Sequence, residues 1–368
     1  MQIGDILNVN SSTLALNKLE LKQNGYSVYG ADGIVGYIEN FQHNEQYISI
    51  VKDGSGVGRL KLCDKETSIL GTLAGLKSKD ENKFILIWSY YLLNTIDFSS
   101  YVKGAGIPHI YFSDYKNVNV GVPSPEEQQK IADCLSSLDD LITAETQKLD
   151  ALKEHKKGLM QQLFPGEGET MPKLRFEEFV GSGEWEVETL NNIAENLDFK
   201  RIPITENARE AGNVPYYGAS GIIDYVKDFI FNEKLLCISE DGANLIARSY
   251  PIAFTISGKT WVNNHAHVLK FSNDFTHTIV ENYLNSISLE DFLTGIAQPK
   301  LNRSQLDIIP IPLSKPNEQR KIALCLSSLN DAIRLQYEKI AQIQKHKIGL
   351  MQGLFPKIAE TSKLEIAS

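Results

Sequence analysis

The chain has 368 residues, of which 42% are hydrophobic and 23% charged, a composition typical of folded globular domains and not of disordered or collagen-like chains. This length is enough for two or three domains of ordinary size. Lys and Arg number 37 against 46 Asp and Glu, so the formal net charge is −9. That balance, taken alone, argues against a protein that coats nucleic-acid phosphates with a basic surface.

The cysteines are isolated, without a C-x-x-C pair or a dense secreted pattern, so we expect neither a structural zinc site nor a disulfide framework. The N-terminus has no signal-peptide pattern, and the purest apolar stretch, from Phe84 to Trp88, is too short to span a bilayer. We therefore predict a cytoplasmic protein that is neither exported nor inserted in a membrane. The four cysteines are Cys63, Cys134, Cys237 and Cys325.

The first predicted unit, residues 1–121, reads as mixed α and β structure. YISIVKDGSGVGRLKLC, from Tyr47, predicts a strand, a glycine-rich turn and a second strand. The run from Gly54 to Gly58 lacks the G-x-G-x-x-G spacing, and an alternating strand follows it instead of a helix. A nucleotide site is therefore not expected there.

Residues 122–165 predict one long helix. Apolar residues recur in a heptad rhythm, Pro125 stands where a first helical turn tolerates proline, and Pro165 ends the pattern. At about 1.5 Å per residue the helix is roughly 57 Å long. The seam residues expected to pair are Ile131, Leu135, Leu138, Ile142, Leu149, Leu152 and Leu159.

A glycine-rich acidic linker, residues 166–171, leads into a second mixed α and β unit, residues 172–310. LLCISEDGANLIARSY, from Leu235, is the counterpart of the first strand, turn and strand. His265 and His267 share one face of a predicted strand but have no third ligand of suitable spacing. We interpret them as structural or polar-recognition histidines, with a metal site as the alternative. Gly258-Lys259-Thr260 lacks the upstream glycine of a P-loop.

Residues 311–356 predict a second long helix, followed by a tail over 357–368. Between Pro125 and Pro165, 23 of 41 residues are identical to those 191 positions later. Since a two-fold related pair needs the same surface twice, we expect the two seams to pair with each other; the alternative is that each helix docks on its own globular unit. The second seam comprises Ile322, Leu326, Leu329, Ile333, Ile340, Ile343 and Leu350, and polar residues interrupt both seams at Glu145 with Gln336 and at Lys156 with Lys347.

Weaker matches continue the repeat upstream. YGADGIVGYI, from Tyr29, matches YGASGIIDYV, from Tyr217, and GAGIPHI, from Gly104, matches GIAQPKL, from Gly295. The chain is thus two tandem copies of one unit. WEVET, from Trp185, has no partner in the first copy, so we expect the first domain to be slightly abbreviated at its edge.

Polar and aromatic residues gather at predicted turns of both copies. Arg and Lys suit guanine edges or phosphates, Asn and Gln suit adenine, and Tyr offers stacking, so these turns have the inventory for reading bases. Each residue alone is equally well a solvated turn former; the argument rests on their recurrence. The candidates are Tyr29, Asp32, Lys52, Ser55, Arg59, Lys103, His109, Tyr217, Ser220, Asn244, Arg248, Asn263, Asn264, Gln298, Lys300, Asn302 and Arg303.

In combination, several sequence motifs of this chain resemble those of the specificity subunits of type I restriction-modification enzymes. They are EQQKIADCLSSLDD with KGLMQQLFP, EQRKIALCLSSLND with IGLMQGLFP, and WVNNHAHVL and AQPKLNRSQLDIIPIP in the second copy. The resemblance covers essentially the whole chain. It implies an α+β fold with an internal pseudo-two-fold repeat, in which two α/β target-recognition domains, 1–121 and 172–310, are separated by two long helices paired as an antiparallel coiled coil.

The resemblance also implies a non-catalytic role. Each recognition domain would read one half of a bipartite, asymmetric double-stranded DNA site, and the helices would dock two methyltransferase subunits and, with them, motor-nuclease subunits. S-adenosylmethionine would be bound by the methyltransferase partners and not by this chain.

Three other functions compete with this reading. A self-contained DNA methyltransferase or nuclease is disfavoured, because no catalytic motif such as G-x-S-x-G, H-E-x-x-H or N/D-P-P-Y/F is present. An acidic DNA mimic is disfavoured because DNA carries about one charge per 1.7 Å, far denser than −9 over this chain. A purely structural coiled coil would leave two loop-bearing domains without a role.

Overall fold

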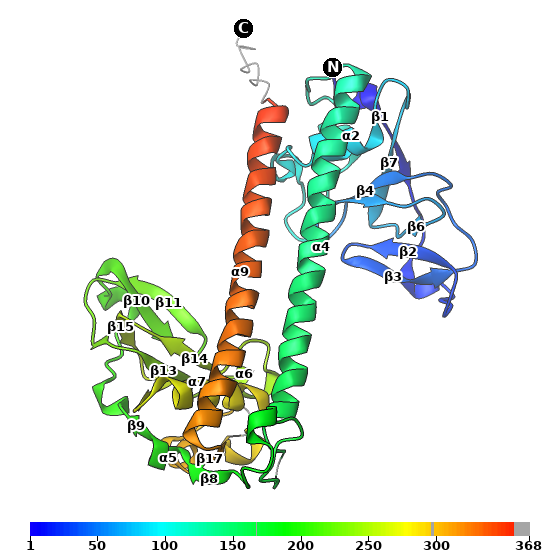
Figure 1. The fold of residues 1–368 in the computed structure, drawn as a ribbon. Coiled ribbons are helices and arrows are strands. Elements are labelled where there is room, and N and C mark those ends of the chain that lie inside the picture. The colour runs from blue at the N-terminus through cyan, green and yellow to red at the C-terminus, as the bar shows by residue number, and fades with distance from the viewer. Residues whose placement is uncertain (167, 296–297, 357–368) are drawn as a thin grey trace. The chain divides into compact units, whose positions relative to one another are not determined.

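The computed structural model describes residues 1–166, 168–295 and 298–356, so the expected tail, 357–368, lies outside the described residues. The chain forms two compact units: unit 1 has residues 1–146 with the chain from Lys339 onward, and unit 2 has residues 147–338. Two long helices, α4 (Pro125–Leu163) and α9 (Pro316–Leu354), contribute to both (Figure 1). The boundary between the units therefore runs through the helices.

Unit 1 contains two sheets. A four-stranded antiparallel sheet has the order β1-β7-β4-β5, and a three-stranded sheet has the order β3-β2-β6, with β2 and β6 parallel. The elements are α1 (Ile3–Ile6), β1 (Leu7–Ser11), β2 (Tyr26–Gly30), β3 (Gly33–Ile38), β4 (Tyr47–Val51), β5 (Leu60–Cys63), β6 (Ser68–Ile69), β7 (Leu73–Ser78), α2 (Leu86–Leu93) and α3 (Phe112–Tyr115).

Unit 2 repeats this topology. Its order β9-β16-β13-β14 corresponds to β1-β7-β4-β5, and β11-β10-β15 corresponds to β3-β2-β6, again with one parallel pair, while β12 joins β15 and β8 pairs with β17. The tandem repeat in the sequence is thus a repeat of fold. The elements are β8 (Glu186–Thr189), α5 (Leu190–Ile193), β9 (Ala194–Asn196), β10 (Ala211–Gly218), β11 (Gly221–Val226), β12 (Phe231–Asn232), β13 (Leu235–Ser239), α6 (Asn244–Ala247), β14 (Ala253–Ile256), β15 (Lys259–Val262), β16 (Ala266–Phe271), α7 (Asp274–Ser286), α8 (Arg303–Asp307) and β17 (Pro310–Leu313).

The strand, turn and strand predicted from Tyr47 is confirmed by β4 and β5, but its counterpart from Leu235 is partly wrong. After β13 the chain forms the short helix α6, and the partner strand β14 begins only at Ala253. The Asn244 amide donates to the carbonyl of Tyr250, which closes this helical turn. The residues from Ile246 to Tyr250 therefore do not form the expected strand, and a side-chain hydrogen bond holds a helical turn there instead.

The two helices confirm the heptad prediction, each with 39 residues. Every predicted seam residue is buried or half-buried. In unit 1, Lys339 pairs with Glu145 at 2.5 Å and Lys347 pairs with Asp139. The α4 partner number falls as the α9 number rises, so the helices run antiparallel. Two of the polar seam residues, Glu145 and Lys347, therefore make cross-helix ion pairs, which favour one register of the helices.

Each globular unit also packs on the helix pair. In unit 1, Ile131 and Leu135 of α4 and Phe355, just after α9, join the core that contains Trp88 of α2. In unit 2, Leu163 of α4 and Leu326 of α9 share a cluster with other buried residues: Met160, Phe164, Trp185, Ile279, Ile322 and Ala323. Self-pairing and docking on the globular units, which the sequence posed as alternatives, are therefore both present.

The segment after the expected linker is held by a buried ion pair. Arg175 makes two 2.7 Å hydrogen bonds to the carboxylate of Glu318, in the first turn of α9, and both side chains are buried. Such a bidentate pair has defined geometry. The chain entering the second domain is therefore anchored to the start of the second helix.

The two units differ at one edge of the fold. In unit 2, β8 and β17 pair over four residues, from Thr189 with Pro310 to Glu186 with Leu313. The equivalent place in unit 1 has one bridge, between Gln2 and Asn119.

His277 predicts an acid-sensitive step in the stability of unit 2. Burial lowers the pKa of this histidine to about 4 from its ordinary 6.5, and its Nε2 lies 2.7 Å from the hydroxyl of Thr255. Because the unfolded chain takes up the proton first, unfolding free energy should fall as pH decreases from about 6.5 to about 4. Urea unfolding at several pH values measures this slope. His277→Gln, which keeps a polar partner for Thr255 without the titration, should flatten it, and an unchanged slope would contradict the assignment.

Candidate nucleic-acid interface

Two loops carry most of the predicted site residues of unit 1, and backbone hydrogen bonds join them. Loop A follows β4 (residues 52–59), and loop B follows Tyr101 (residues 102–110). The Gly54 amide donates to the Pro108 carbonyl at 2.9 Å, and the Ile110 amide donates to the Lys52 carbonyl at 2.8 Å. Lys103 and His109 also exchange two 2.8 Å bonds across loop B. The two loops are therefore one joined surface.

Unit 2 joins the equivalent loops at equivalent residues. The Gly242 amide donates to the Pro299 carbonyl at 3.1 Å, and the Leu301 amide donates to the Glu240 carbonyl at 2.7 Å. Thr294 and Lys300 exchange the two 2.8 Å bonds. Loop A′ (residues 240–248) and loop B′ (residues 293–295 and 298–301) thus share the joining backbone hydrogen bonds of loops A and B, while their side chains differ.

In unit 1 the charged candidates are held by acidic partners. Arg59 donates to the carboxylate of Asp32 at 2.7 Å, and Lys103 pairs with Asp114 at 2.6 Å. Lys52 lies 3.5 Å from Asp53. Ser55 is exposed, and His109 is half-buried. The side chains of Arg59 and Lys103 are 55% and 64% exposed, so their ion pairs contribute little to stability and leave the cation open to solvent, whereas Lys52 is largely covered.

Unit 2 places a largely buried charge network beneath its loops. Arg201 bonds to Glu240 at 2.6 Å and lies 3.3 Å from Asp198, while Lys300 lies 3.2 Å from Glu240. Burial opposes ionisation of Asp198, but the hydrogen bond and charge of His267 and the charge of Arg201 lower the pKa of its carboxyl. The network therefore fixes loop A′ against the chain that follows β9.

His267 belongs to this network as a structural residue. Its Nδ1 lies 2.6 Å from the Asp198 carboxylate and its Nε2 lies 2.7 Å from the Leu301 carbonyl. The ring is therefore held at both of its nitrogens. His265 is half-exposed and contacts the carboxylate of Asp241 at 2.7 Å. Within the described ranges, no group of three His, Cys, Asp or Glu side chains is arranged to hold a metal.

Four of the predicted base-reading residues are buried or bonded within the fold. Arg248 donates to the carbonyls of Leu245, Leu284 and Ile287, so its guanidinium ties α6 to α7 and faces no base. Asn244, Asn263 and Tyr29 are buried. These four side chains are held within the fold, and their contact with bases stays a prediction.

The remaining candidates of unit 2 lie on or beside its loops. Ser220, Asn264, Gln298, Lys300 and Arg303 are exposed. Tyr217 is half-buried, and so is Asn302, whose amide donates to Thr294 Oγ1 at 2.9 Å. Sequence reasoning missed Arg201 and Asp198, because no motif links them to their partners Glu240 and His267, which lie 39 and 69 positions away.

The chain matches the family model described as the type I restriction modification DNA specificity domain twice, over residues 1–154 and 182–345. It belongs to the type I restriction-modification specificity subunits. Each match contains one globular unit and part of one long helix of this specificity subunit, so the repeat seen in the structure is a repeat of the family domain.

Known relatives agree with this assignment. This chain is 26% identical over 340 residues to the type I restriction enzyme MjaVIII specificity subunit of Methanocaldococcus jannaschii. The match covers 84% of this chain and 78% of the relative. The chain is 32% identical over 153 residues to the putative specificity subunit S.HindORF215P of Haemophilus influenzae, where the match spans only 39% of the relative and 42% of this chain.

A crystal structure of a type I restriction-modification S subunit from M. genitalium has the same fold. Its TM-score is 0.69 at 18% identity, with 97% of this chain and 96% of that chain covered.

Among the described residues, no helix combines the length and apolar character needed to cross a bilayer.

Proposed function

We propose that this chain selects the DNA sequence for a type I restriction-modification complex, with each globular unit reading one half of a bipartite site. One observation carries the proposal: the same two loops are joined by the same backbone hydrogen bonds in both units, at Gly54 and Ile110 and at Gly242 and Leu301. A fixed backbone with variable side chains is what base reading requires, since phosphate contacts position a protein and side chains at base edges specify sequence.

The two halves of the site are proposed to differ in sequence. Asp32 in unit 1 has no charged counterpart at the matching turn of unit 2, where Ser220 replaces it. Different donors and acceptors select different base edges. The site is therefore asymmetric.

The helices are proposed to set the distance between the half-sites. A helix of 39 residues is about 58 Å long at about 1.5 Å per residue, which compares with about 34–36 Å per turn of duplex. Ion pairs such as Lys339 with Glu145 then fix the register of the pair, and with it the spacing.

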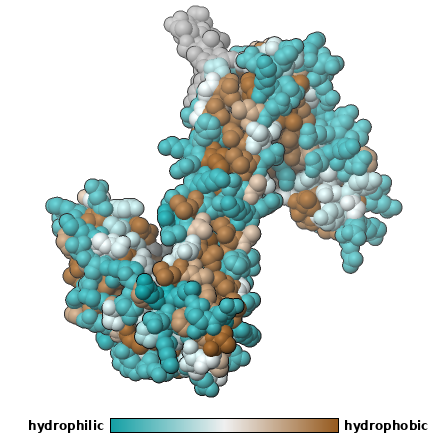
Figure 2. Space-filling view, in the orientation of Figure 1, coloured by the Kyte–Doolittle hydropathy of each residue, from teal (hydrophilic) through white to brown (hydrophobic). Residues whose placement is uncertain are grey.

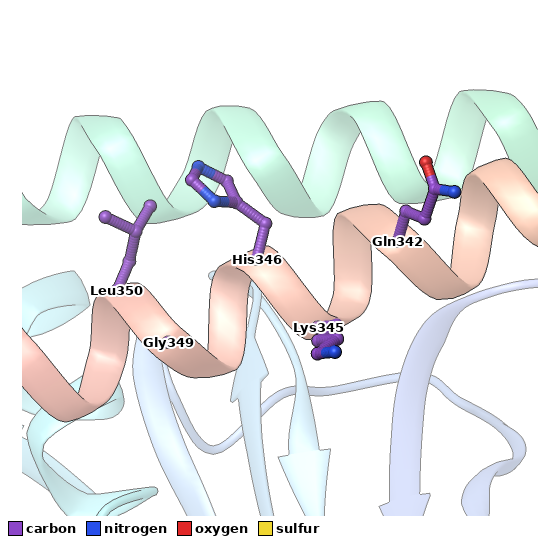
Figure 3. A pocket seen from close by; sticks show the side chains of 5 residues that line it. All are labelled: Gln342, Lys345, His346, Gly349 and Leu350. Atoms are coloured by element: carbon purple, nitrogen blue, oxygen red, sulfur yellow. The ribbon is translucent and has the colours of Figure 1, made fainter.

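We further propose that methyltransferase subunits dock on the helices. A groove of about 540 Å³ lies along α9 and is lined by Gln342, Lys345, His346, Gly349 and Leu350 (Figure 3). Apolar surface runs along the part of α9 in unit 1 (Figure 2), where Ile348 is exposed. Gly349 and its repeat partner Gly158 both lie five residues before the end of their helix, with open space beside them. Glycine there costs about 1 kcal/mol against alanine, which a closely approaching partner backbone would explain.

Gly349→Leu should separate folding from assembly. The free subunit should be as stable as wild type or slightly more so, because leucine is the better helix former. Binding to the methyltransferase subunit should weaken at least tenfold, measured by isothermal titration calorimetry. Gln344→Leu, on a different side of α9, is the matched control and should bind normally. Equal affinities for the two variants would contradict a docking surface at Gly349.

The chemistry is proposed to lie in the partners. The methyltransferase subunits would bind S-adenosylmethionine and take the target adenine out of the stack, and motor-nuclease subunits would join to cut unmodified DNA. The net charge of −9 means that this chain alone should bind DNA weakly, with the partners supplying much of the phosphate neutralisation.

Mapping methylated adenines in cells with and without this gene tests the proposal. We expect one split, asymmetric motif to lose methylation when the gene is deleted and to regain it on complementation. Unchanged methylation in a strain with working partner subunits would refute it. Methyl transfer by the purified chain alone would favour the rival self-contained methyltransferase.

A further inference from the structure

Both units carry a β-hairpin with exposed apolar side chains at its tip. In unit 1, β2 and β3 close at Gly30 and Gly33, and Ile34 and Tyr37 are 50% and 37% exposed. In unit 2, β10 and β11 close at Gly218 and Gly221, and Ile222 and Tyr225 are 48% and 53% exposed. Single exposed apolar residues are common on protein surfaces. The same pair at the same place in both copies calls for a shared cause.

The hairpins also share an irregularity. The register passes from Val28 with Gly36 to Tyr29 with Ile34, so Val35 is an extra residue in β3. In unit 2 it passes from Tyr216 with Asp224 to Tyr217 with Ile222, so Ile223 is the extra residue in β11. A β-bulge redirects the side chains beside it, and it stands directly next to the tip isoleucine in both hairpins.

Each tip is locked by a hydrogen bond to the same backbone atom, from a different donor. Arg59 donates to the carbonyl of Ala31 at 3.1 Å, and in unit 2 the Ser239 hydroxyl donates to the carbonyl of Ala219 at 2.6 Å. The tips need glycine at the turn, where Gly33 has φ +131° and Gly221 has φ +106°. Two different side chains, Arg59 and Ser239, therefore hold the equivalent carbonyl of the tip in the two units.

The locks also connect the tips to the proposed reading surface. Arg59 belongs to loop A, so its bond to Ala31 joins the unit 1 tip to that loop. In unit 2 the donor of the lock, Ser239, directly precedes loop A′, so its bond to Ala219 joins the unit 2 tip to that loop. Each tip isoleucine thus lies on the outer strand of its sheet, β3 or β11, next to the proposed base-reading loops. The major groove of DNA is wide enough to admit such β-structure.

From these observations we propose that the two hairpin tips enter a groove of the duplex and that Ile34 and Ile222 contact apolar base edges there, one in each half-site. This inference rests on the proposed function and adds a class of contact to it. Polar loop residues would select hydrogen-bonding edges, and the isoleucines would select apolar edges such as a thymine methyl group. A partner protein on the tips is the competing occupant.

Photocrosslinking tests the inference in the assembled complex. The photoreactive benzoylphenylalanine replaces Ile34 or Ile222 in the full-length chain, which is bound to methyltransferase subunits and to the motif found by methylation mapping. We expect Ile34 probes to label one half-site and Ile222 probes the other. Val180, 71% exposed and outside the proposed surface, is the control position and should label no DNA. Labelling of a methyltransferase subunit, or no labelling above the control, would overturn the inference.

Alanine variants give an independent measurement. Ile34→Ala and Ile222→Ala should each reduce affinity of the complex for its site roughly tenfold, with mismatches tolerated in one half-site only. Assembly with the methyltransferase should be unchanged; weaker assembly would favour a protein occupant and contradict the groove contact. If the wild-type complex methylates no split motif, the proposed function itself fails. If it does and the tips do not touch DNA, only this inference fails.

Discussion

Removing seven residues from each long helix should shorten the permitted DNA spacer by about 3 base pairs and leave both half-site sequences unchanged. The deletion takes residues 143–149 from α4 and 337–343 from α9, which lie opposite each other by the pairing of Glu145 with Lys339. Seven residues remove about 10.5 Å of helix, which equals about 3 base pairs at about 3.4 Å each. A heptad keeps the seam in phase, so the helices should still pair.

Methylation mapping of cells carrying the double deletion measures the new spacer. Three base pairs also rotate one half-site by about 100° relative to the other, because a turn contains about 10–10.5 base pairs. We therefore expect slower methylation of the shortened site together with loss of the original one. Deletion from α4 alone is the control; it breaks the pairing register and should abolish methylation of both sites. New half-site letters with the old spacer would disprove the spacer role.

Replacing Arg201 by alanine should destabilise unit 2 by about 3–5 kcal/mol, because it leaves the largely buried carboxylates of Asp198 and Glu240 without their main partner. Arg201 also donates to the carbonyl of Ala266 at 2.9 Å, so β16 loses a contact too. Recognition of one half-site should be lost with it. Arg334→Ala, in the same unit but with exposed partners Asp331 and Glu338, should change stability by less than about 1 kcal/mol.

Acid-induced unfolding provides a second measurement of the role of Arg201. Burial opposes ionisation of both Asp198 and Glu240, but Arg201 and His267 lower the pKa values of their carboxyl groups below the ordinary range. A depressed carboxyl pKa contributes stability above the unfolded value, and that stability is lost as pH falls through the folded value. The Arg201→Ala variant should therefore unfold at higher pH than wild type in an acid titration followed by circular dichroism. Coincident titrations would show that Arg201 does not hold these carboxylates.

Several features were predictable from the sequence because they follow from local periodicity. The heptad steps from Ile131 to Leu159 and the terminal prolines predicted both helices. The turn from Lys52 to Arg59 was predictable from its glycines, and the copied phrases located the two equivalent loop surfaces. Family membership was evident from the same phrases, which the family model matches over both repeats.

The roles of individual site residues were not predictable in this way. Arg248 and Asn244 look like loop residues in the sequence. In the structure, the Asn244 side chain donates to the carbonyl of Tyr250, and the Arg248 guanidinium donates to the carbonyl of Leu284 in α7. Arg201 stands 39 positions from Glu240, and no local pattern links the two. The β-bulges at Val35 and Ile223 are also invisible to an alternation pattern, because a one-residue insertion appears only when the partner strand is placed beside it.

The sequence by itself therefore determined the repeat, the two long helices, the family and the position of the loops proposed for recognition, since these depend on neighbours within one turn or one repeated motif. Only the tertiary structure decided which side chains are free to meet DNA. Whether a cation such as Arg59 faces solvent or one such as Arg201 is enclosed by carboxylates depends on chain segments that come together only on folding. The same charged group then serves either recognition or stability, according to what surrounds it.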